Sequence, residues 1–273
     1  MAQWFSHKDI HRLRTNLGHR YAARMQAHRG FAAFTAITAV MLIAVAAMSL
    51  VTVTVPANST LMGFWAGADT PGGGEGVRAN YDRVSSYLGT PDVYRMFYPG
   101  SPGTNFVGSN ADFGPPVVVS FKFRPQEVVT GQHDATLRAW FNSIPTARQV
   151  WWSYFHEPEN DIEAGAYTAA QYRAAWDHIM RLAPTRDTLV PTLILMRYTL
   201  SIPTRRTVSW YVSEGLKVAP RGALCWDSYL TGSLTMKQVV DDPAAVSESF
   251  GLDFAICETS AKDPAKGSSS LRT

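Results

Sequence analysis

The chain has 273 residues, of which 46% are hydrophobic and 17% are charged, and this composition excludes a disordered or low-complexity protein. Aromatic residues make up 12%, which a large core explains, although aromatic-rich domains also stack sugars and other flat ligands. The excess of positive over negative charge lies in residues 1–30, where basic side chains far outnumber the single acid Asp9. The rest of the chain is nearly neutral, so we expect no nucleic-acid partner.

The first predicted element is an apolar segment at residues 31–57, which contains the run FAAFTAITAVMLIAVAAMSLVTVTV. No charged residue occurs between Arg29 and Asp69, and a run of this length can cross a bilayer. The basic leader at 1–30 favours a cytoplasmic N-terminus. A signal peptide, cleaved after the small residues at 55–57, and an uncleaved anchor both fit, and the length of the run favours the anchor. Either interpretation predicts a secreted or membrane-anchored, extracytoplasmic domain.

The remaining body, residues 58–261, alternates strands and helices. Apolar runs predict seven strands, at 61–68, 93–98, 117–123, 149–155, 189–196, 223–230 and 253–260. Helical spacing and capping patterns predict helices at 78–89, 133–144, 168–182, 207–217 and 236–251. Strands without alternation are buried on both faces, as in a parallel sheet covered by helices. Repeats of roughly 30 residues predict an α/β fold, a (β/α)8-type TIM barrel that lacks its eighth βα unit.

The tail at 262–273 is polar and too short for that eighth unit, which needs roughly 30 residues. We therefore expect open edges at the strands 61–68 and 253–260, because nothing else pairs with them. A truncated gene product, a partner that completes the sheet and a smaller fold are the three explanations. We favour truncation, which predicts a marginally stable domain with weak or no activity.

Two acids, Glu157 and Glu258, directly follow buried strands. Side chains at the carboxyl ends of barrel strands line the active site, and an acid there is costly unless it faces a cleft or finds partners. Two such carboxyl groups can serve as the acid and the nucleophile of glycoside hydrolysis. The alternatives are that Glu157 belongs to the first turn of a helix opening at Pro158 and that Glu258 is a solvated strand-end acid.

The motifs around these acids resemble those of the clan A glycoside hydrolases. The sequence FHEPEN (155–160) ends the fourth strand with His-Glu and a nearby Asn, and a lone Glu ends the seventh strand about 100 residues later. The His-Glu pair is most similar to family 26, the mannanase and β-glucanase family. WDSY (226–229) resembles the stretch that supplies a Tyr to hold the nucleophile. The resemblance covers residues 60–260.

The resemblance implies a retaining enzyme that acts on a β-linked polysaccharide of the β-mannan or β-glucan type without a cofactor. It assigns Glu157 as acid/base and Glu258 as nucleophile, with Tyr229 donating a hydrogen bond to Glu258. His156, beside the acid, and Asn160 would bind substrate. For His156 the alternative is a hydrogen-bonded histidine of the core, and for Tyr229 it is plain packing.

Tryptophans in the predicted strands are candidates for sugar platforms. We expect this role for Trp65 and Trp226, and core packing for Trp151 and Trp152.

Other chemistries fit less well. The chain has no GxSxG elbow, no HExxH motif and no phosphate-binding glycine pattern, and its few body histidines predict no metal site. Glu159 and Asp161 are expected to be solvated loop acids. Cys225 and Cys257 lie on neighbouring predicted strands and could pair, but two buried thiols is the simpler account. A barrel that binds carbohydrate or serves as a surface protein without turnover is the alternative function.

Overall fold

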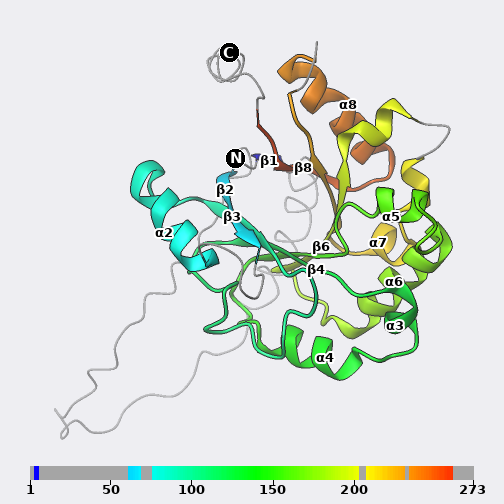
Figure 1. Cartoon of the computed structure of the whole chain (residues 1–273), viewed down its shortest axis with the longest axis horizontal. Helices are drawn as coiled ribbons and strands as arrows, with labels where there is room; N and C mark the ends of the chain where they lie inside the picture. The colour runs from blue at the N-terminus through cyan, green and yellow to red at the C-terminus, as the bar shows by residue number, and fades with distance from the viewer. Residues whose placement is uncertain (1–2, 6–60, 69–75, 203–206, 231–233, 261–273) are drawn as a thin grey trace, which may run out of the picture. The chain divides into compact units, whose positions relative to one another are not determined.

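The computed structural model describes residues 3–5, 61–68, 76–202, 207–230 and 234–260, along which strands and helices alternate (Figure 1). The strands are β1 (Gln3–Phe5), β2 (Leu61–Ala68), β3 (Val93–Phe97), β4 (Val117–Phe121), β5 (Val150–Tyr154), β6 (Leu189–Met196), β7 (Ala223–Asp227) and β8 (Asp253–Glu258). The α-helices are α2 (Val77–Leu88), α3 (Pro125–Val129), α4 (Asp134–Ser143), α5 (Glu159–Glu163), α6 (Ala169–Leu182), α7 (Glu214–Val218) and α8 (Met236–Ser249). Two 3-10 turns are η1 (Arg197–Ser201) and η2 (Val208–Trp210).

Strands β2 to β8 form a curled parallel sheet in which the strands follow one another in chain order. The predicted α/β fold with a parallel sheet is confirmed, and its seven parallel strands are compatible with a TIM-type arrangement. The expectation of open edges was wrong. Strand β1 pairs antiparallel with both β2 and β8, so the sheet closes. On β2 it pairs with Leu61 and Met62, and on β8 with residues 254–256, so part of each edge gains a backbone partner.

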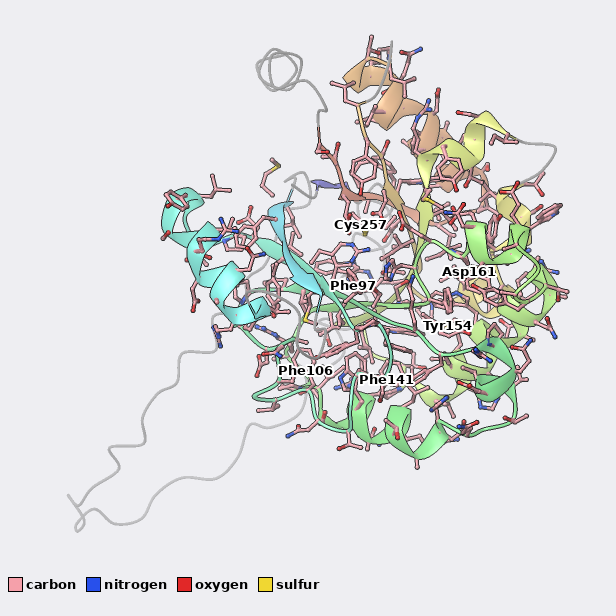
Figure 2. The ribbon with its side chains drawn as sticks, viewed as in Figure 1. Phe97, Phe106, Phe141, Tyr154, Asp161 and Cys257 are labelled. Atoms are coloured by element: carbon pink, nitrogen blue, oxygen red, sulfur yellow. A yellow bond between two sulfur atoms is a disulfide. The ribbon has the colours of Figure 1, made fainter. Side chains whose placement is uncertain are left out.

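The alternation of side chains along the strands produces two core layers. The outer layer lies between strands and helices, where Figure 2 labels Phe106, Phe141 and Tyr154, all fully buried. The inner layer is built from strand residues only: Leu61, Val93, Val118, Trp151, Val190, Ile194, Ala223, Cys225, Ala255 and Cys257. Because no helix contributes to this second cluster, it fills the inside of the curled sheet. The expectation that Trp151 and Trp152 pack in the core is confirmed, one in each layer.

Helix boundaries follow local capping chemistry. Thr168 and Gln171 form the predicted capping box at the start of α6. The single helix expected at 207–217 was wrong, because the chain makes the short turn η2 and then restarts. The Ser213 hydroxyl accepts the Leu216 N–H at 3.3 Å and caps a separate helix, α7.

The predictions for the basic leader, for the apolar segment at 31–57 and for the tail at 262–273 lie outside the described residues, apart from β1. Within the part of the chain that the structure describes, no helix has the length and apolar character to span a bilayer.

Candidate active site

A buried arginine joins two acids at the carboxyl end of the sheet. Arg95, on β3, places Nη2 3.2 Å from Oε1 of Glu258 and 3.5 Å from Oδ2 of Asp227. The hydroxyl of Tyr229 donates to the other Glu258 oxygen, Oε2, at 2.7 Å. Both oxygens of Glu258 therefore face a donor, one of them cationic. The predicted hydrogen bond from Tyr229 to Glu258 is confirmed.

The chain reaches Glu157 through a left-handed turn at the end of β5. Phe155 and Glu157 have φ angles of 46° and 52°, and among the described residues these are the non-glycine positions with positive φ. Neighbouring strands hold the turn, because the Phe155 N–H donates to the Phe121 carbonyl and the Glu157 N–H donates to the Ile194 carbonyl. Such conformations are costly for residues with a Cβ and cluster at functional sites.

The surroundings of Glu157 raise the pKa of its carboxyl group. Burial is the largest cause, and the negative charge of Glu258 is the second. The cations Arg95 and Lys122 act against the rise without cancelling it. A carboxyl group that keeps its proton to a higher pH can serve as a general acid.

His156 lies beside this acid, as predicted, and is only 5% exposed. Its Nδ1 is 2.8 Å from the Ser120 hydroxyl, and its ring packs against Phe97 with centroids 4.7 Å apart. Burial, together with the charges of Arg95 and Lys122, holds the pKa of this imidazole well below its usual value. His156 is therefore a neutral hydrogen-bonding group.

The other predicted substrate-binding residues have different outcomes. Asn160 is exposed on α5 and accepts a hydrogen bond from the Tyr198 hydroxyl at 2.6 Å. Trp226 is fully buried, and its indole N–H donates to Ser247 of α8 at 3.0 Å. The expectation of a sugar platform at Trp226 was wrong, because its side chain is fully buried in the outer core. The side chain of Trp65 lies outside the described part of the structure.

Sequence reasoning missed three charged residues of this site, Arg95, Asp227 and Lys122. A signal existed for the first two, because each interrupts or ends an otherwise apolar strand, VYRMF and ALCWD. Burial raises the pKa of the Asp227 carboxyl well above its usual range. Burial also lowers the pKa of Lys122, whose Nζ lies 4.9 Å from the centre of the Phe155 ring.

Glu159 was expected to be a solvated loop acid, and this was wrong: the residue is fully buried. Its Oε1 accepts the Met196 N–H at 2.7 Å and the Thr199 hydroxyl at 2.9 Å. These bonds tie α5 to the last residue of β6 and to the turn η1. Burial raises the pKa of Glu159 to about 7.

Cys225 and Cys257 form a disulfide, so the simpler account of two free thiols was wrong. The bond joins β7 to β8 inside the sheet, and the two residues are 0% and 2% exposed. The adjacency of the two strands was predicted, but the redox state was not.

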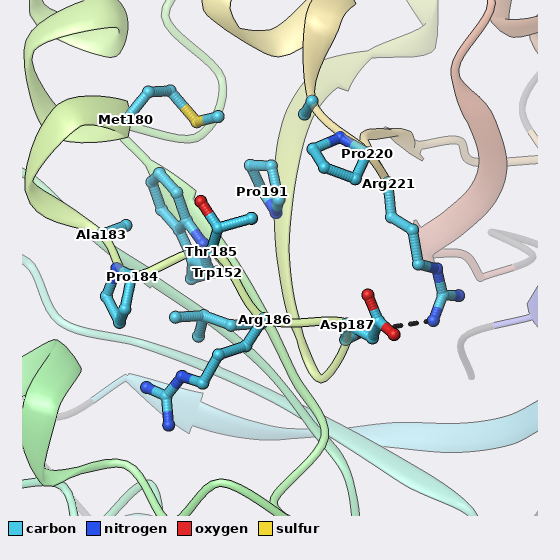
Figure 3. A pocket seen from close by; sticks show the side chains of 12 residues that line it. Trp152, Met180, Ala183, Pro184, Thr185, Arg186, Asp187, Pro191, Pro220 and Arg221 are labelled. Atoms are coloured by element: carbon cyan, nitrogen blue, oxygen red, sulfur yellow. Dashed lines mark hydrogen bonds between the residues drawn. The ribbon is translucent and has the colours of Figure 1, made fainter. Parts of the chain in front are cut away.

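One hollow lies away from these residues (Figure 3). It is open to solvent and is lined near the start of β6 by Leu189 and Pro191 together with Arg186, Asp187, Pro220 and Arg221. The glutamates follow the opposite ends of the parallel strands, so this hollow is not part of the candidate site. Among the described residues, no group of three or more His, Cys, Asp or Glu side chains is arranged to hold a metal ion.

Comparison with known proteins adds no assignment, because no protein-family model, no curated protein and no solved structure matches this chain. The family resemblance read from the sequence therefore stays a prediction.

Proposed function

We propose that the protein is a retaining glycoside hydrolase of the clan A, family 26 type, acting on a β-linked polysaccharide of the β-mannan or β-glucan type. The observation that carries the proposal is the contrast between two carboxyl groups at one end of the sheet. Glu258 is held between Arg95 and Tyr229, while burial and the Glu258 charge raise the pKa of Glu157. The donors around Glu258 suit a group that attacks as a nucleophile, and the raised pKa of Glu157 suits a group that donates a proton.

In the first step the Glu258 carboxylate attacks the anomeric carbon, and the bond from that carbon to the leaving oxygen breaks. Glu157 gives its proton to the leaving oxygen, and an ester links the sugar to Glu258. Ester formation removes the negative charge of Glu258, which is one cause of the raised pKa of Glu157. The pKa of Glu157 therefore falls at the moment when this group must act as a base.

In the second step Glu157 takes a proton from water, and the water oxygen attacks the anomeric carbon. The bond to Glu258 breaks, its carboxylate is restored, and Glu157 is again protonated. Arg95 and Tyr229 stabilise the departing carboxylate through the contacts described above. His156, neutral and adjacent, contributes a polar edge for a sugar hydroxyl.

The disulfide supports the proposal that the domain works outside the cytoplasm, because such bonds persist in oxidising compartments. In the proposed topology residues 1–30 stay in the cytoplasm or are removed with the signal segment. Either event takes residues 3–5 away from β2 and β8, so the β1 pairing and the exported topology are alternative states of the N-terminus. Protease added to intact cells should digest residues 58–261 and spare residues 1–30. A full-length chain soluble in the cytoplasm would contradict export.

The activity test is release of reducing ends from β-mannan, mixed-linkage β-glucan and an α-glucan by the full chain, with Glu258→Gln as background. We expect cleavage of a β-linked polymer by the wild-type protein only. Binding of these polymers without cleavage would instead support the alternative of a carbohydrate-binding barrel. Equal cleavage by the variant would show that the activity belongs to a contaminant or to other residues.

A further inference from the structure

The disulfide lies next to the site in the sequence: one cysteine is two residues from Asp227 and the other is one residue from Glu258. Cys225 and Asp227 are alternate residues of β7, and Cys257 directly precedes Glu258 at the end of β8 (Figure 2 labels Cys257). Both cysteines belong to the inner layer of the sheet. The covalent bond therefore ties together the two strands that present the site acids.

The pairing of β7 with β8 is irregular at this point. Trp226 is opposite Ile256, but the next residue of β7, Asp227, is opposite Glu258. Cys257 is thus an extra residue in β8, which makes it the centre of a β-bulge. A bulge places two residues of one strand opposite one residue of its partner and changes where the following side chain points.

Without the bulge, Glu258 would face the wrong side of the sheet. Phe254 and Ile256 belong to the outer layer, so strict alternation would send Glu258 outward toward the helices. The extra residue restores the inward direction, because Glu258 now shares a register position with inward-facing Asp227. From there its Oε1 lies 3.2 Å from the buried guanidinium of Arg95.

We infer that the Cys225–Cys257 disulfide is a positioning element, which holds Cys257 in the bulge and thereby keeps Glu258 directed into the site. The inference rests on the proposed function in that Glu258 is taken as the nucleophile. It adds that a covalent bond, as well as side-chain contacts, determines where that nucleophile lies. Neither cysteine touches the reacting atoms in this account.

The backbone supports the same arrangement beyond the bulge. The Ser228 N–H donates to the Glu258 carbonyl at 2.8 Å, and the Leu230 N–H donates to the Ser260 carbonyl at 3.0 Å. These bonds fix the shifted register only after Cys257. The disulfide fixes the bulge residue itself, which has no partner of its own in the ladder between β7 and β8.

The test uses the full chain with Cys225→Ala, which removes the bond with little change in volume, and with Cys225→Ala/Cys257→Val, which also fills the space of the second sulfur. Val190→Ala, in the same inner layer on β6, is the control for a general loss of packing. All are assayed well below their melting temperatures. We expect both cysteine variants to lose roughly 100-fold in kcat with KM within about twofold, and the control to keep wild-type kcat.

A second measurement does not depend on turnover. The pKa of Glu157 is followed by NMR of carboxyl-labelled glutamate in the wild-type protein and in both cysteine variants. Glu157 is influenced by Glu258, Arg95, Lys122 and Asp227, and the substitutions are designed to move Glu258. We expect the pKa of Glu157 to be lower in the variants, because the Glu258 charge is farther away, and unchanged in Val190→Ala.

The outcomes separate the two proposals. If the wild-type protein cleaves no glycoside while the cysteine variants show the drop in the Glu157 pKa, the function is overturned and the positioning is supported. An active wild-type protein whose cysteine variants keep both kcat and the Glu157 pKa overturns the positioning and supports the function. If one cysteine variant does not fold, the other decides. If neither folds while Val190→Ala does, the bond is a requirement for folding rather than a positioning element, and the inference is overturned.

Discussion

Glu157, after β5, and Glu258, at the end of β8, are identical side chains in opposite surroundings. The first follows a left-handed turn, and its pKa is raised mainly by burial. The second ends a bulged strand and is held by Arg95 and Tyr229. Donors and cations around each side chain, rather than residue type, therefore distinguish the proposed acid from the proposed nucleophile at one sheet edge.

The largest expected effect comes from removing the held carboxylate. Glu258→Ala should lower kcat on activated glycosides by about 10⁴-fold or more, since no group remains to form the ester. Azide should restore part of the turnover by attacking from the vacated side and giving a glycosyl azide of inverted configuration, which chromatography and NMR would identify. Glu248→Gln, an exposed acid on α8, is the matched control and should behave as wild type. A Glu258→Ala protein with wild-type activity would show that Glu258 is not the nucleophile.

Removing the protonated carboxyl group should give a more selective loss. Glu157→Ala should lower kcat/KM by about 10² to 10⁴-fold on natural polysaccharide, which needs a proton on its leaving oxygen. Aryl glycosides with acidic phenols should form the ester at rates close to wild type, because these leaving groups need little protonation. The dependence of rate on leaving-group pKa measures this directly. A uniform loss across all leaving groups would show that Glu157 has another role.

The contact from Tyr229 should matter less. Tyr229→Phe removes the 2.7 Å hydrogen bond to Glu258 but leaves Arg95 in place. Because Tyr229 is 37% exposed, we take the low end of the about 1.5–3 kcal/mol typical for hydrogen bonds to charged groups and expect kcat to fall about tenfold. Tyr87→Phe, on the exposed surface of α2, is the control. An unchanged kcat would mean that Arg95 alone holds the carboxylate.

Glu159 tests how burial acts on an acid that is not a reactant. Its folded pKa of about 7 exceeds the unfolded value near 4.5, so its proton-linked stabilisation is complete below pH 4.5 and is lost as the pH rises through 7. Glu159→Gln keeps an acceptor for Met196 and cannot ionise. The free energy of unfolding of the variant should match that of wild type near pH 5. At pH 8 it should exceed the wild-type value by roughly 3 kcal/mol, so the variant is the more stable protein there. Chemical denaturation at both pH values measures this, and parallel pH profiles would contradict the assignment.

In the full chain, the smallest effect on chemistry is expected from β1, the strand that closes the sheet, because the site described above is built from other strands. Trp4 of β1 is opposite Leu61 of β2 and Ala255 of β8. The substitution Trp4→Pro removes the backbone N–H donor at this position. The melting temperature should fall by a few degrees, as for a loss of about 1 kcal/mol, while kcat stays within about twofold. Gln3→Ala keeps the backbone and is the control. A tenfold change in kcat would show that closure shapes the site.

The sequence allowed prediction of the parallel strands and of the places of both glutamates at strand ends, because apolar runs and the acids that follow them are local patterns. It did not allow prediction of β1, because a three-residue strand formed by residues 3–5 pairs with partners far along the chain. The inward direction of Glu258 depends on a bulge, and the burial of Trp226 depends on α8. These are consequences of register and packing between elements, which no single segment encodes.

The most direct test of the central claim is to trap the ester on Glu258. The wild-type protein would be incubated with 2-deoxy-2-fluoro β-glycosyl fluorides of the mannan and glucan type, digested, and examined by mass spectrometry. The account predicts one added fluorosugar on the peptide that contains Glu258, no label on Glu258→Gln, and slow recovery of activity as water hydrolyses the ester. Turnover of the substrate with the label on another residue, or with no label at all, would contradict it.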